Sequence, residues 1–388
     1  MLKIKTGAEL TIDLNAVKDN WLSMYNLLKG ENENGICAAV VKADSYGLGV
    51  DRIAPVLYEA GCRDFFVAYL SEGMELRQFV GKDSRIFAIH GHFAGEESYF
   101  DEYDIIPVLN NREQIKTWLE YNKKAGKNLP CALHFDTGMT RLGFSAEDRE
   151  FLFSAGTPLK KLNVALVMSH LSDGGDLGKK GGKSSRQLDL FKKIKENVCA
   201  LLGYKPLFSL SASAGMLIGG DYIFDLVRPG ACLYGFLPEE SLAGKVQLKN
   251  VVSLNARILQ IQNTTIGQTV GYGSSYTFTK NGKVLTAALG YADGYFRSFG
   301  GGKGCGWLDG YRLPVIGRVS MDLTTFDAGN VPDDVLAKND MIEIIGEHIP
   351  LNEVAENAGT IPYEIITDLG GRYERIYTAV ATDTENGV

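Results

Sequence analysis

The chain has 388 residues, of which 45% are hydrophobic and 22% charged, as in a folded protein with one large domain or two medium ones. Its net charge of -7 argues against nucleic-acid binding, which usually leaves a basic footprint on the sequence. No apolar run approaches the ~20 residues of a membrane span, and no apolar signal core follows the first residues, so we expect a cytoplasmic protein.

In the first part of the chain, up to about Phe236, short β-branched runs alternate with amphipathic stretches that predict helices, for example 113–124 and 186–202. The predicted strands are 36–41, 65–67, 85–89, 105–108, 131–135, 162–168, 207–209 and 226–228. Eight strands separated by helix-length segments fit a (β/α)8 barrel of the TIM type, which typically needs ~250 residues. The least convincing helix is the one between 89 and 105.

From about Val251 onward, long helical patterns become scarce and turn residues separate short strands. The predicted strands there are 251–261, 283–289, 314–319 and 341–345. We therefore predict an α/β chain with a barrel domain at 1–244 and a β-rich C-terminal domain at 245–388, joined through a polar stretch. A strand at about 9–14 precedes the barrel, and the sequence leaves open whether it pairs with the second domain.

Lys42 stands at the end of the first predicted barrel strand, where α/β barrels place catalytic groups. A lysine desolvated at that place can lose its proton and attack carbonyls. The usual alternative is a lysine that simply exits to solvent. Tyr46 and the turn at 47–49 favour the functional interpretation, because the glycines allow the backbone to approach a phosphate-bearing ligand closely.

Three other barrel strands are followed by polar groups suited to anions. Arg141 follows the fifth strand and could bind a carboxylate in bidentate fashion, although a surface arginine is about as common there. Ser213 follows the seventh strand in a small-residue loop of the kind that binds phosphate in barrels, or that forms an ordinary turn. Arg228 ends the eighth strand, where an unpaired charge is costly and a structural ion pair is the alternative.

The β-rich half holds a further group of motifs whose tyrosines, taken singly, would be interpreted as packing residues. They are Val270-Gly271-Tyr272-Gly273-Ser274-Ser275-Tyr276, Gly290-Tyr291-Ala292-Asp293-Gly294-Tyr295 and Gly317-Arg318-Val319-Ser320-Met321-Asp322. The scattered cysteines include no Cys-x-x-Cys pair, and the single His-x-His pair lacks the remaining ligands of a zinc site. We therefore expect no metal.

Taken together, these motifs closely resemble alanine racemases, a family of fold-type III pyridoxal-phosphate enzymes. The resemblance runs from Glu9 to Tyr377, and its most specific pieces are Val40-Val41-Lys42-Ala43-Asp44-Ser45-Tyr46-Gly47, Asp136-Thr137-Gly138-Met139, Gly290-Tyr291-Ala292-Asp293-Gly294 and Ser320-Met321-Asp322. It implies pyridoxal 5'-phosphate as cofactor, interconversion of L- and D-alanine that supplies D-alanine for peptidoglycan, and a head-to-tail homodimer with active sites at the interface.

The resemblance also implies residue roles. Lys42 matches the lysine that holds the cofactor and acts as one base, and Tyr272 of the partner subunit matches the base on the opposite face. The groups matched to the cofactor are Arg228 at the pyridine nitrogen, His170 supporting that arginine, and the phosphate contacts Tyr46, Ser213, Gly230 and Ala231. The groups matched to the substrate are Arg141 and the Met321 backbone at its carboxylate and the partner subunit's Tyr291 at the mouth of the site. Asp322 follows Met321 in the same partner-derived loop.

The chain departs from the family pattern at three positions. His134 stands where many members carry a carbamate-modified lysine that orients the carboxylate-binding arginine, so the sequence leaves open what orients Arg141. A common phosphate-binding tyrosine near the C-terminus falls on Gly371, with Tyr373 and Tyr377 nearby. Ser320 replaces a frequent cysteine, which is a small change.

Three alternatives remain from the sequence. A related amino-acid decarboxylase would carry a cysteine motif near the C-terminus, whereas Cys305 is the last cysteine here and lies in no such motif. A non-catalytic pyridoxal-phosphate carrier resembles the barrel alone and would lack the β-rich half. A broad-specificity or serine racemase of the same family stays open, because residues from two chains line the pocket.

Overall fold

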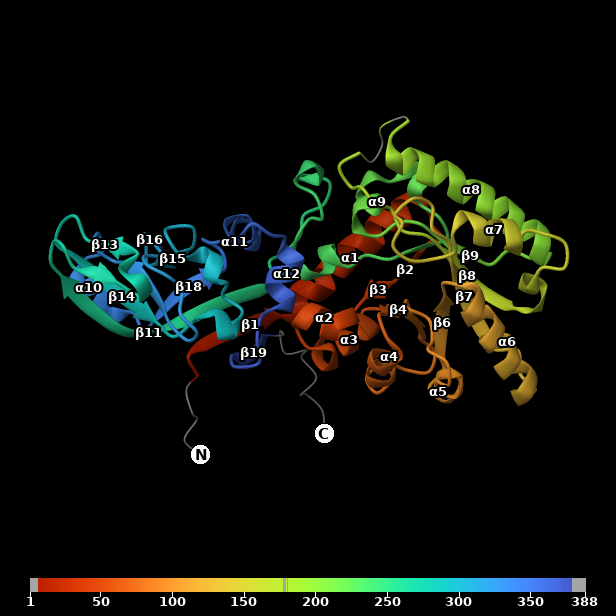
Figure 1. Ribbon diagram of the computed structural model, residues 1–388, viewed down its shortest axis with the longest axis horizontal. Helices are drawn as coiled ribbons and strands as arrows, with labels where there is room; N and C mark the ends of the chain where they lie inside the picture. Colours follow the sequence, from red (N-terminus) through yellow and green to blue (C-terminus); the bar gives the residue numbers. More distant parts are fainter. Residues whose placement is uncertain (1–5, 177–178, 180, 379–388) are drawn as a thin grey trace, which may run out of the picture. The chain divides into compact units, whose positions relative to one another are not determined.

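The computed structural model describes residues 6–176, 179 and 181–378, so the outermost residues of both predicted domains lie outside the description (Figure 1). The chain divides into two compact units. The barrel unit comprises Val17–Ser45 and Gly49–Lys249, and the β-rich unit comprises the chain from Asn250 together with Tyr46–Leu48 and the residues up to Ala16. None of the helices in the described ranges combines the length and apolar character that a membrane span needs.

The barrel unit is built on a parallel sheet of seven strands in chain order. They are β3 (Ala39–Val40), β4 (Asp64–Val67), β5 (Arg85–Ala88), β6 (Ile105–Leu109), β7 (Pro130–His134), β8 (Asn163–Met168) and β9 (Leu207–Ser209). These strands are apolar and almost wholly buried, and the rings of Phe66 and Phe87 stack between neighbouring strands with centroids 4.7 Å apart. Burial on both faces explains why the strands read as continuous apolar runs.

Two short strands close the ring. β2 (Ile36–Cys37) lies one residue before β3 and pairs in parallel with β10 (Leu226–Val227). The N–H of Ala38 continues that ladder to the carbonyl of Val227 at 3.0 Å, so β2 and β3 act as one strand. Beyond β9, a parallel bridge between Ala212 and Arg228 joins the other edge to β10. The described strands therefore form a closed barrel of eight, and the predicted fold class is confirmed.

Helices connect the strands in the expected alternation (Figure 1). They are α1 (Leu14–Glu31), α3 (Val50–Glu59), α4 (Leu70–Leu76), α5 (Glu97–Glu102), α6 (Arg112–Ala125), α7 (Ala146–Leu152), α8 (Lys183–Leu202) and α9 (Ser213–Ile218). α6 begins after Asn111, whose side chain accepts a hydrogen bond from the N–H of Gln114, and ends at Gly126 with φ 65°. The doubtful third connection holds only the six-residue α5.

The β-rich unit has a sheet whose main path is β16-β15-β18-β11-β1-β19, with β14 and β17 attached to β11. The strands are β1 (Ala8–Asp13), β11 (Val252–Thr264), β14 (Gly282–Ala287), β15 (Cys305–Leu308), β16 (Tyr311–Pro314), β17 (Thr324–Asp327), β18 (Met341–Ile345) and β19 (Glu374–Thr378), with a separate pair of β12 (Thr269–Val270) and β13 (Tyr276–Thr277). Three short helices complete it: α10 (Asp333–Lys338), α11 (Leu351–Ala358) and α12 (Pro362–Thr367). β1 lies between β11, to which it is antiparallel, and β19, to which it is parallel.

One predicted strand, 314–319, is wrong. β16 ends at Pro314, the position where that prediction begins. Gly317 has φ 71°, a conformation that L-residues rarely adopt, so the backbone turns there instead of continuing as a strand. The neighbouring Val315 keeps only an isolated bridge to Phe326.

Candidate active site

Lys42 lies directly after the first barrel strand and begins α2 (Lys42–Gly47). The next four residues, Ala43, Asp44, Ser45 and Tyr46, have φ of 52, 54, 52 and 59°, so α2 is a left-handed turn. Left-handed backbone costs roughly 1–2 kcal/mol per L-residue and is kept only where surrounding contacts impose it. The Asp44 side chain supplies one such contact by accepting a hydrogen bond from the N–H of Val50 at 2.6 Å.

The electrostatic surroundings of Lys42 favour its neutral form. Lys42 keeps an exposed surface, yet the protein packed around its amine and, second, the charge of Arg141 lower its pKa, while Glu72 opposes them. A lysine with a lowered pKa has a larger neutral fraction near pH 7 and is a better nucleophile and base.

Arg228 is a buried cation at the end of β10, with 3% of its surface exposed. Its guanidinium donates to the Ser209 hydroxyl and, at 2.7 Å, to the carbonyl of Ser169. Burial lowers the pKa of Arg228 to about 9, which leaves it charged at neutral pH. Among the described residues no carboxylate pairs with it, so the barrel mouth has a positive charge without a protein counter-charge.

Two histidines beside Arg228 are held neutral. Burial, followed by the charge of Arg228, lowers the pKa of His134 to about 4 and the pKa of His170 to about 3. The geometry also fixes the tautomer of His134. The amide nitrogen of Asn110 donates to the carbonyls of Ile89 and Val108, so its oxygen must accept from His134 Nδ1 at 2.8 Å. His134 Nε2 is therefore an acceptor.

Arg141 is exposed on the loop after β7. That loop is shaped by Asp136, whose Oδ1 accepts from the backbone N–H groups of Gly138 at 2.8 Å and Met139 at 2.9 Å. The charge of Arg141 lowers the pKa of Lys42, His134 and His170, so it lies near all three. A neutral His134 with an acceptor nitrogen therefore lies near Arg141, at the position where many members of the resembled family carry a negatively charged carbamate.

Ser213 and the segment after β10 form a cluster of small polar groups. Ser213 begins α9, and its hydroxyl accepts from the N–H of Gly230 at 3.0 Å and of Cys232 at 3.4 Å. Ala231 begins the 3-10 helix η3 (Ala231–Tyr234) immediately after Gly230. Convergent N–H groups and a hydroxyl are the donors that phosphate binds in such loops.

In the β-rich unit, Tyr46 is buried with 7% of its surface exposed, and burial raises its pKa. Its ring lies against Tyr363 of α12, with centroids 5.9 Å apart. The adjoining Gly47 is fixed too, because a Cβ there would lie 2.9 Å from the carbonyl oxygen of Ile366. α12 thus packs directly against the Tyr46 segment.

Tyr363 is a residue that the sequence analysis missed. That analysis placed the family's C-terminal tyrosine at Gly371, with Tyr373 and Tyr377 as neighbours. In the structure the Tyr373 hydroxyl donates to the carbonyl of Asp293, and the Tyr377 hydroxyl donates to the carbonyl of Leu48 at 3.0 Å. The ring against Tyr46 belongs to Tyr363, and the available signal was a tyrosine directly after Pro362 at a helix start.

The β-rich unit also brings two sequence motifs together. The N–H groups of Tyr291 and Ala292 donate to the carbonyls of Ser320 and Met321, each at 3.0 Å. Gly290 allows this approach, because a Cβ there would lie 2.5 Å from the Ser320 carbonyl oxygen and closer still to that of Met321. Both motifs therefore form one surface, although about thirty residues separate them in the sequence.

Three apolar side chains project from this region. Tyr272, in the 3-10 helix η5 (Tyr272–Ser274), is 71% exposed, Met321 is 53% exposed and Tyr291 is 44% exposed. Behind them, Arg372 bridges Asp322 at 2.7 Å and Asp293 at 3.1 Å. Exposed aromatic and thioether groups are typical of an interaction surface.

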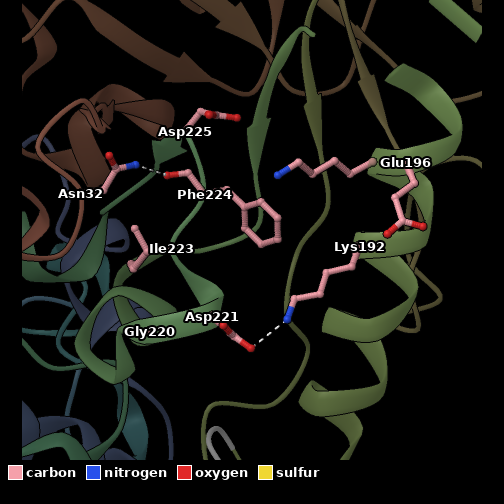
Figure 2. Close-up of a pocket in the computed structure, with 9 residues that line it drawn as sticks. Asn32, Lys192, Glu196, Gly220, Asp221, Ile223, Phe224 and Asp225 are labelled. Carbon is pink, nitrogen blue, oxygen red and sulfur yellow. Dashed lines mark hydrogen bonds and ion pairs between the residues drawn. The ribbon is translucent and has the colours of Figure 1, made fainter. Parts of the chain in front are cut away.

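A separate pocket of about 480 Å³ opens elsewhere in the barrel unit, between α8 and the segment before β10 (Figure 2). Figure 2 shows Lys192 reaching Asp221, with which it forms an ion pair at 2.8 Å. Asp225 of this pocket precedes β10, whereas Arg228 follows it. The pocket therefore lies toward the N-terminal ends of the strands, away from the end where barrels carry their chemistry.

Family models cover nearly the whole chain. The model "Alanine racemase, N-terminal domain" matches residues 12–238, and "Alanine racemase, C-terminal domain" matches residues 251–377.

The chain belongs to the alanine racemase family.

The alanine racemase of Brucella canis is 40% identical over 390 residues, which cover 97% of this chain and 95% of that protein. The biosynthetic alanine racemase of Agrobacterium fabrum is 41% identical over 95% of this chain and 93% of its own. Among solved structures, the alanine racemase of Bartonella henselae with covalently bound pyridoxal phosphate superposes with a TM-score of 0.86 at 35% identity, covering 97% of this chain and all of the other. That of Streptomyces lavendulae gives 0.86 at 27% identity, covering 97% and 98%. The predicted family is confirmed.

Proposed function

We propose that this chain is a cytoplasmic, pyridoxal-phosphate-dependent alanine racemase. It interconverts L- and D-alanine and so supplies the D-alanine used in peptidoglycan. The observation that carries the proposal is the end of the barrel where Lys42, with a lowered pKa, lies near neutral histidines and an uncompensated Arg228. The match to an alanine racemase over 97% of the chain supports alanine as the substrate.

The residues present fit the cofactor. Lys42 would be the amine that holds it, and Ser213 with the backbone at Gly230 and Ala231 would receive its phosphate. The family resemblance implies a further phosphate contact from Tyr46, against which Tyr363 packs. A buried cation without a carboxylate suits an electron-rich ring nitrogen, which Arg228 would face. When bound, pyridoxal phosphate delocalises the negative charge left at Cα after the α-proton leaves.

The protein's own residues then move the proton. Lys42 Nζ takes it from one face of Cα or returns it there, and its lowered pKa makes the neutral amine available. The Tyr272 hydroxyl of the partner subunit exchanges the proton on the opposite face. Two bases on opposite faces give access to both enantiomers. Arg141 and the Met321 backbone of the partner subunit would hold the substrate carboxylate, and the partner subunit's Tyr291 would stand at the mouth of the site.

Arg228 affects how long the negative charge at Cα persists after the α-proton has left. A guanidinium that stays charged at neutral pH and faces the ring nitrogen would oppose its protonation and weaken the electron sink. His170, kept neutral by burial and by Arg228, adds no competing positive charge. A shorter-lived charge at Cα has fewer chances to be protonated at the wrong carbon, which favours racemisation over transamination.

The active enzyme is a homodimer with shared sites. The exposed Tyr272, Tyr291 and Met321 of the β-rich unit support this assembly, since all three present apolar surface to solvent. A head-to-tail dimer with two-fold symmetry presents this surface of each subunit to the barrel of the other.

Subunit exchange tests both the function and the shared site. Lys42→Ala and Tyr272→Phe should each nearly abolish D/L-alanine interconversion, whereas Tyr99→Phe, at an exposed tyrosine on α5, should be neutral. In a mixed dimer one site carries both lesions and the other carries none. Activity should therefore return in proportion to the amount of mixed dimer formed. Verified mixed dimers as inactive as their parents would rule out the shared site. Turnover rates on a panel of amino acids that includes serine test which substrate the enzyme prefers.

A further inference from the structure

Glu72 in α4 lies beside the turn that carries Lys42. Its carboxylate accepts three backbone hydrogen bonds: from Ala43 to Oε1 at 2.9 Å, and from Ala68 and Tyr69 to Oε2 at 2.6 and 3.3 Å. A carboxylate acceptor makes each bond stronger than a neutral one. Glu72 belongs to none of the motifs that the sequence singled out.

Helix capping explains two of these three contacts. Glu72 is the third residue of α4, and its bond to the N–H of Tyr69 is the ordinary capping-box bond. Both capping contacts use Oε2. Oε1 instead accepts a hydrogen bond from the N–H of Ala43, which lies in a different strand–helix connection. This bond is the part that needs another explanation.

The bonded N–H belongs to the peptide that joins Lys42 to Ala43. Ala43 is also the first of the four left-handed residues, with φ 52°. If that peptide plane rotated, the turn would relax toward right-handed or extended backbone, and the Lys42 side chain would point in a different direction. The Glu72 bond opposes this rotation at the residue where the strained turn begins.

We propose, on the basis of the racemase function above, that Glu72 is a positioning residue: it clamps the Lys42–Ala43 peptide to α4 and holds the Lys42 amine in its working direction. Glu72 touches neither substrate nor cofactor in this role. Within the described residues, the charged and titratable groups that interact with Lys42 are Glu72, Arg141, His90 and His170. Burial and then the charge of Lys42 lower the pKa of His90, and Lys42 also contributes to the lowered pKa of His170.

Glu72→Gln tests the clamp, because glutamine keeps the size but turns one acceptor oxygen into an NH2 group facing an N–H. Glu75→Gln is the matched control, an exposed glutamate on the same helix. The first readout uses protein without cofactor: the rate at which acetic anhydride labels Lys42, followed by mass spectrometry against pH. We expect the midpoint of that profile to fall in Glu72→Gln, and to stay at the wild-type value in Glu75→Gln. An unchanged midpoint in Glu72→Gln would overturn the proposal.

With cofactor, we expect kcat for alanine to fall ~10-fold in Glu72→Gln while KM changes by less than ~2-fold, because the lysine and not the carboxylate-binding group is misplaced. Since Lys42 labelling is read without turnover, it reports on the influence of Glu72 on Lys42 even if alanine proves not to be the substrate, and the variant below separates the clamp from the loss of the Glu72 charge. If kcat falls and KM rises by the same factor in Glu72→Gln, the positioning role is contradicted.

A second variant separates the clamp from simple loss of stability or charge. Glycine adopts φ 52° without strain, so Ala43→Gly removes much of what Glu72 must oppose. The Glu72→Gln change should therefore cost less in an Ala43→Gly background, by at least ~3-fold in kcat. If the loss is the same in both backgrounds, Glu72 does not act through the turn.

Discussion

Replacing Gly290 with alanine tests how closely two loops of the β-rich unit must approach. The added Cβ would lie 2.5 Å from the carbonyl oxygen of Ser320 and nearer to that of Met321. Both are backbone atoms, so no side chain can swing away. The Gly290 and Met321 segments must separate by roughly 1 Å to reach normal contact distance.

The size of the effect follows from the bonds that span this contact. Separation weakens the hydrogen bonds from Tyr291 to Ser320 and from Ala292 to Met321, now 3.0 Å each. At a net ~1 kcal/mol per bond, Gly290→Ala should lower the free energy of unfolding by about 2 kcal/mol. Because Met321 is proposed to hold the substrate carboxylate, a displacement of this size should cost on the order of 100-fold in kcat/KM.

Urea unfolding measures the stability change, and D/L-alanine interconversion measures the rate. Gly371→Ala is the matched control in the same unit, since a Cβ there meets no described atom within 4 Å and its φ is not left-handed. We expect that control to match wild type in both assays. If Gly290→Ala keeps wild-type stability and turnover, the close approach of the two motifs has no bearing on the site.

Two further predictions concern the barrel mouth and the Tyr46 segment. Tyr363→Phe should raise the dissociation constant for pyridoxal phosphate ~10-fold by titration of cofactor-free protein, whereas Tyr373→Phe should affect stability instead, because its hydroxyl donates to Asp293. The pKa of His134 is about 4 in the fold, below the ~6.5 of an unfolded histidine, so the unfolded chain binds more protons between these values. Stability should therefore fall as pH drops from ~6.5 to ~4, and His134→Asn should flatten that dependence in urea titrations; an unchanged slope would contradict a neutral His134.

Much of the barrel could be predicted from the sequence because its strands are buried on both faces. Such strands are runs of apolar residues, and the loops after them carry the polar residues that were singled out, including Lys42, Ser213 and Arg228. The segment 314–319 has a similar apolar composition, but the left-handed φ of Gly317 ends the strand there. Composition alone does not report that turn.

The parts of the site that the sequence did not reveal depend on contacts between distant segments. Glu72 acts on Ala43 from a separate connection, and Tyr363 meets Tyr46 from the other end of the chain. The left-handed turn has little local signal either, since Ala43, Ser45 and Tyr46 rarely adopt left-handed backbone and Asp44 alone does so more readily. Each of these features is imposed by tertiary packing, which periodicity does not encode.

The position of β1 determines the order in which the protein can be completed on the ribosome. β1 emerges first, yet both of its neighbours in the sheet, β11 and β19, are synthesised later, β11 roughly 240 residues after it. At ~5–20 residues per second, the strand waits on the order of 10–50 s for its first partner, while the whole barrel is made. The β-rich unit therefore cannot be expressed alone as a C-terminal fragment with an intact sheet. A fragment starting at Asn250 would expose the open edges of β11 and β19 to other chains, whereas supplying β1 as a separate peptide should restore the sheet.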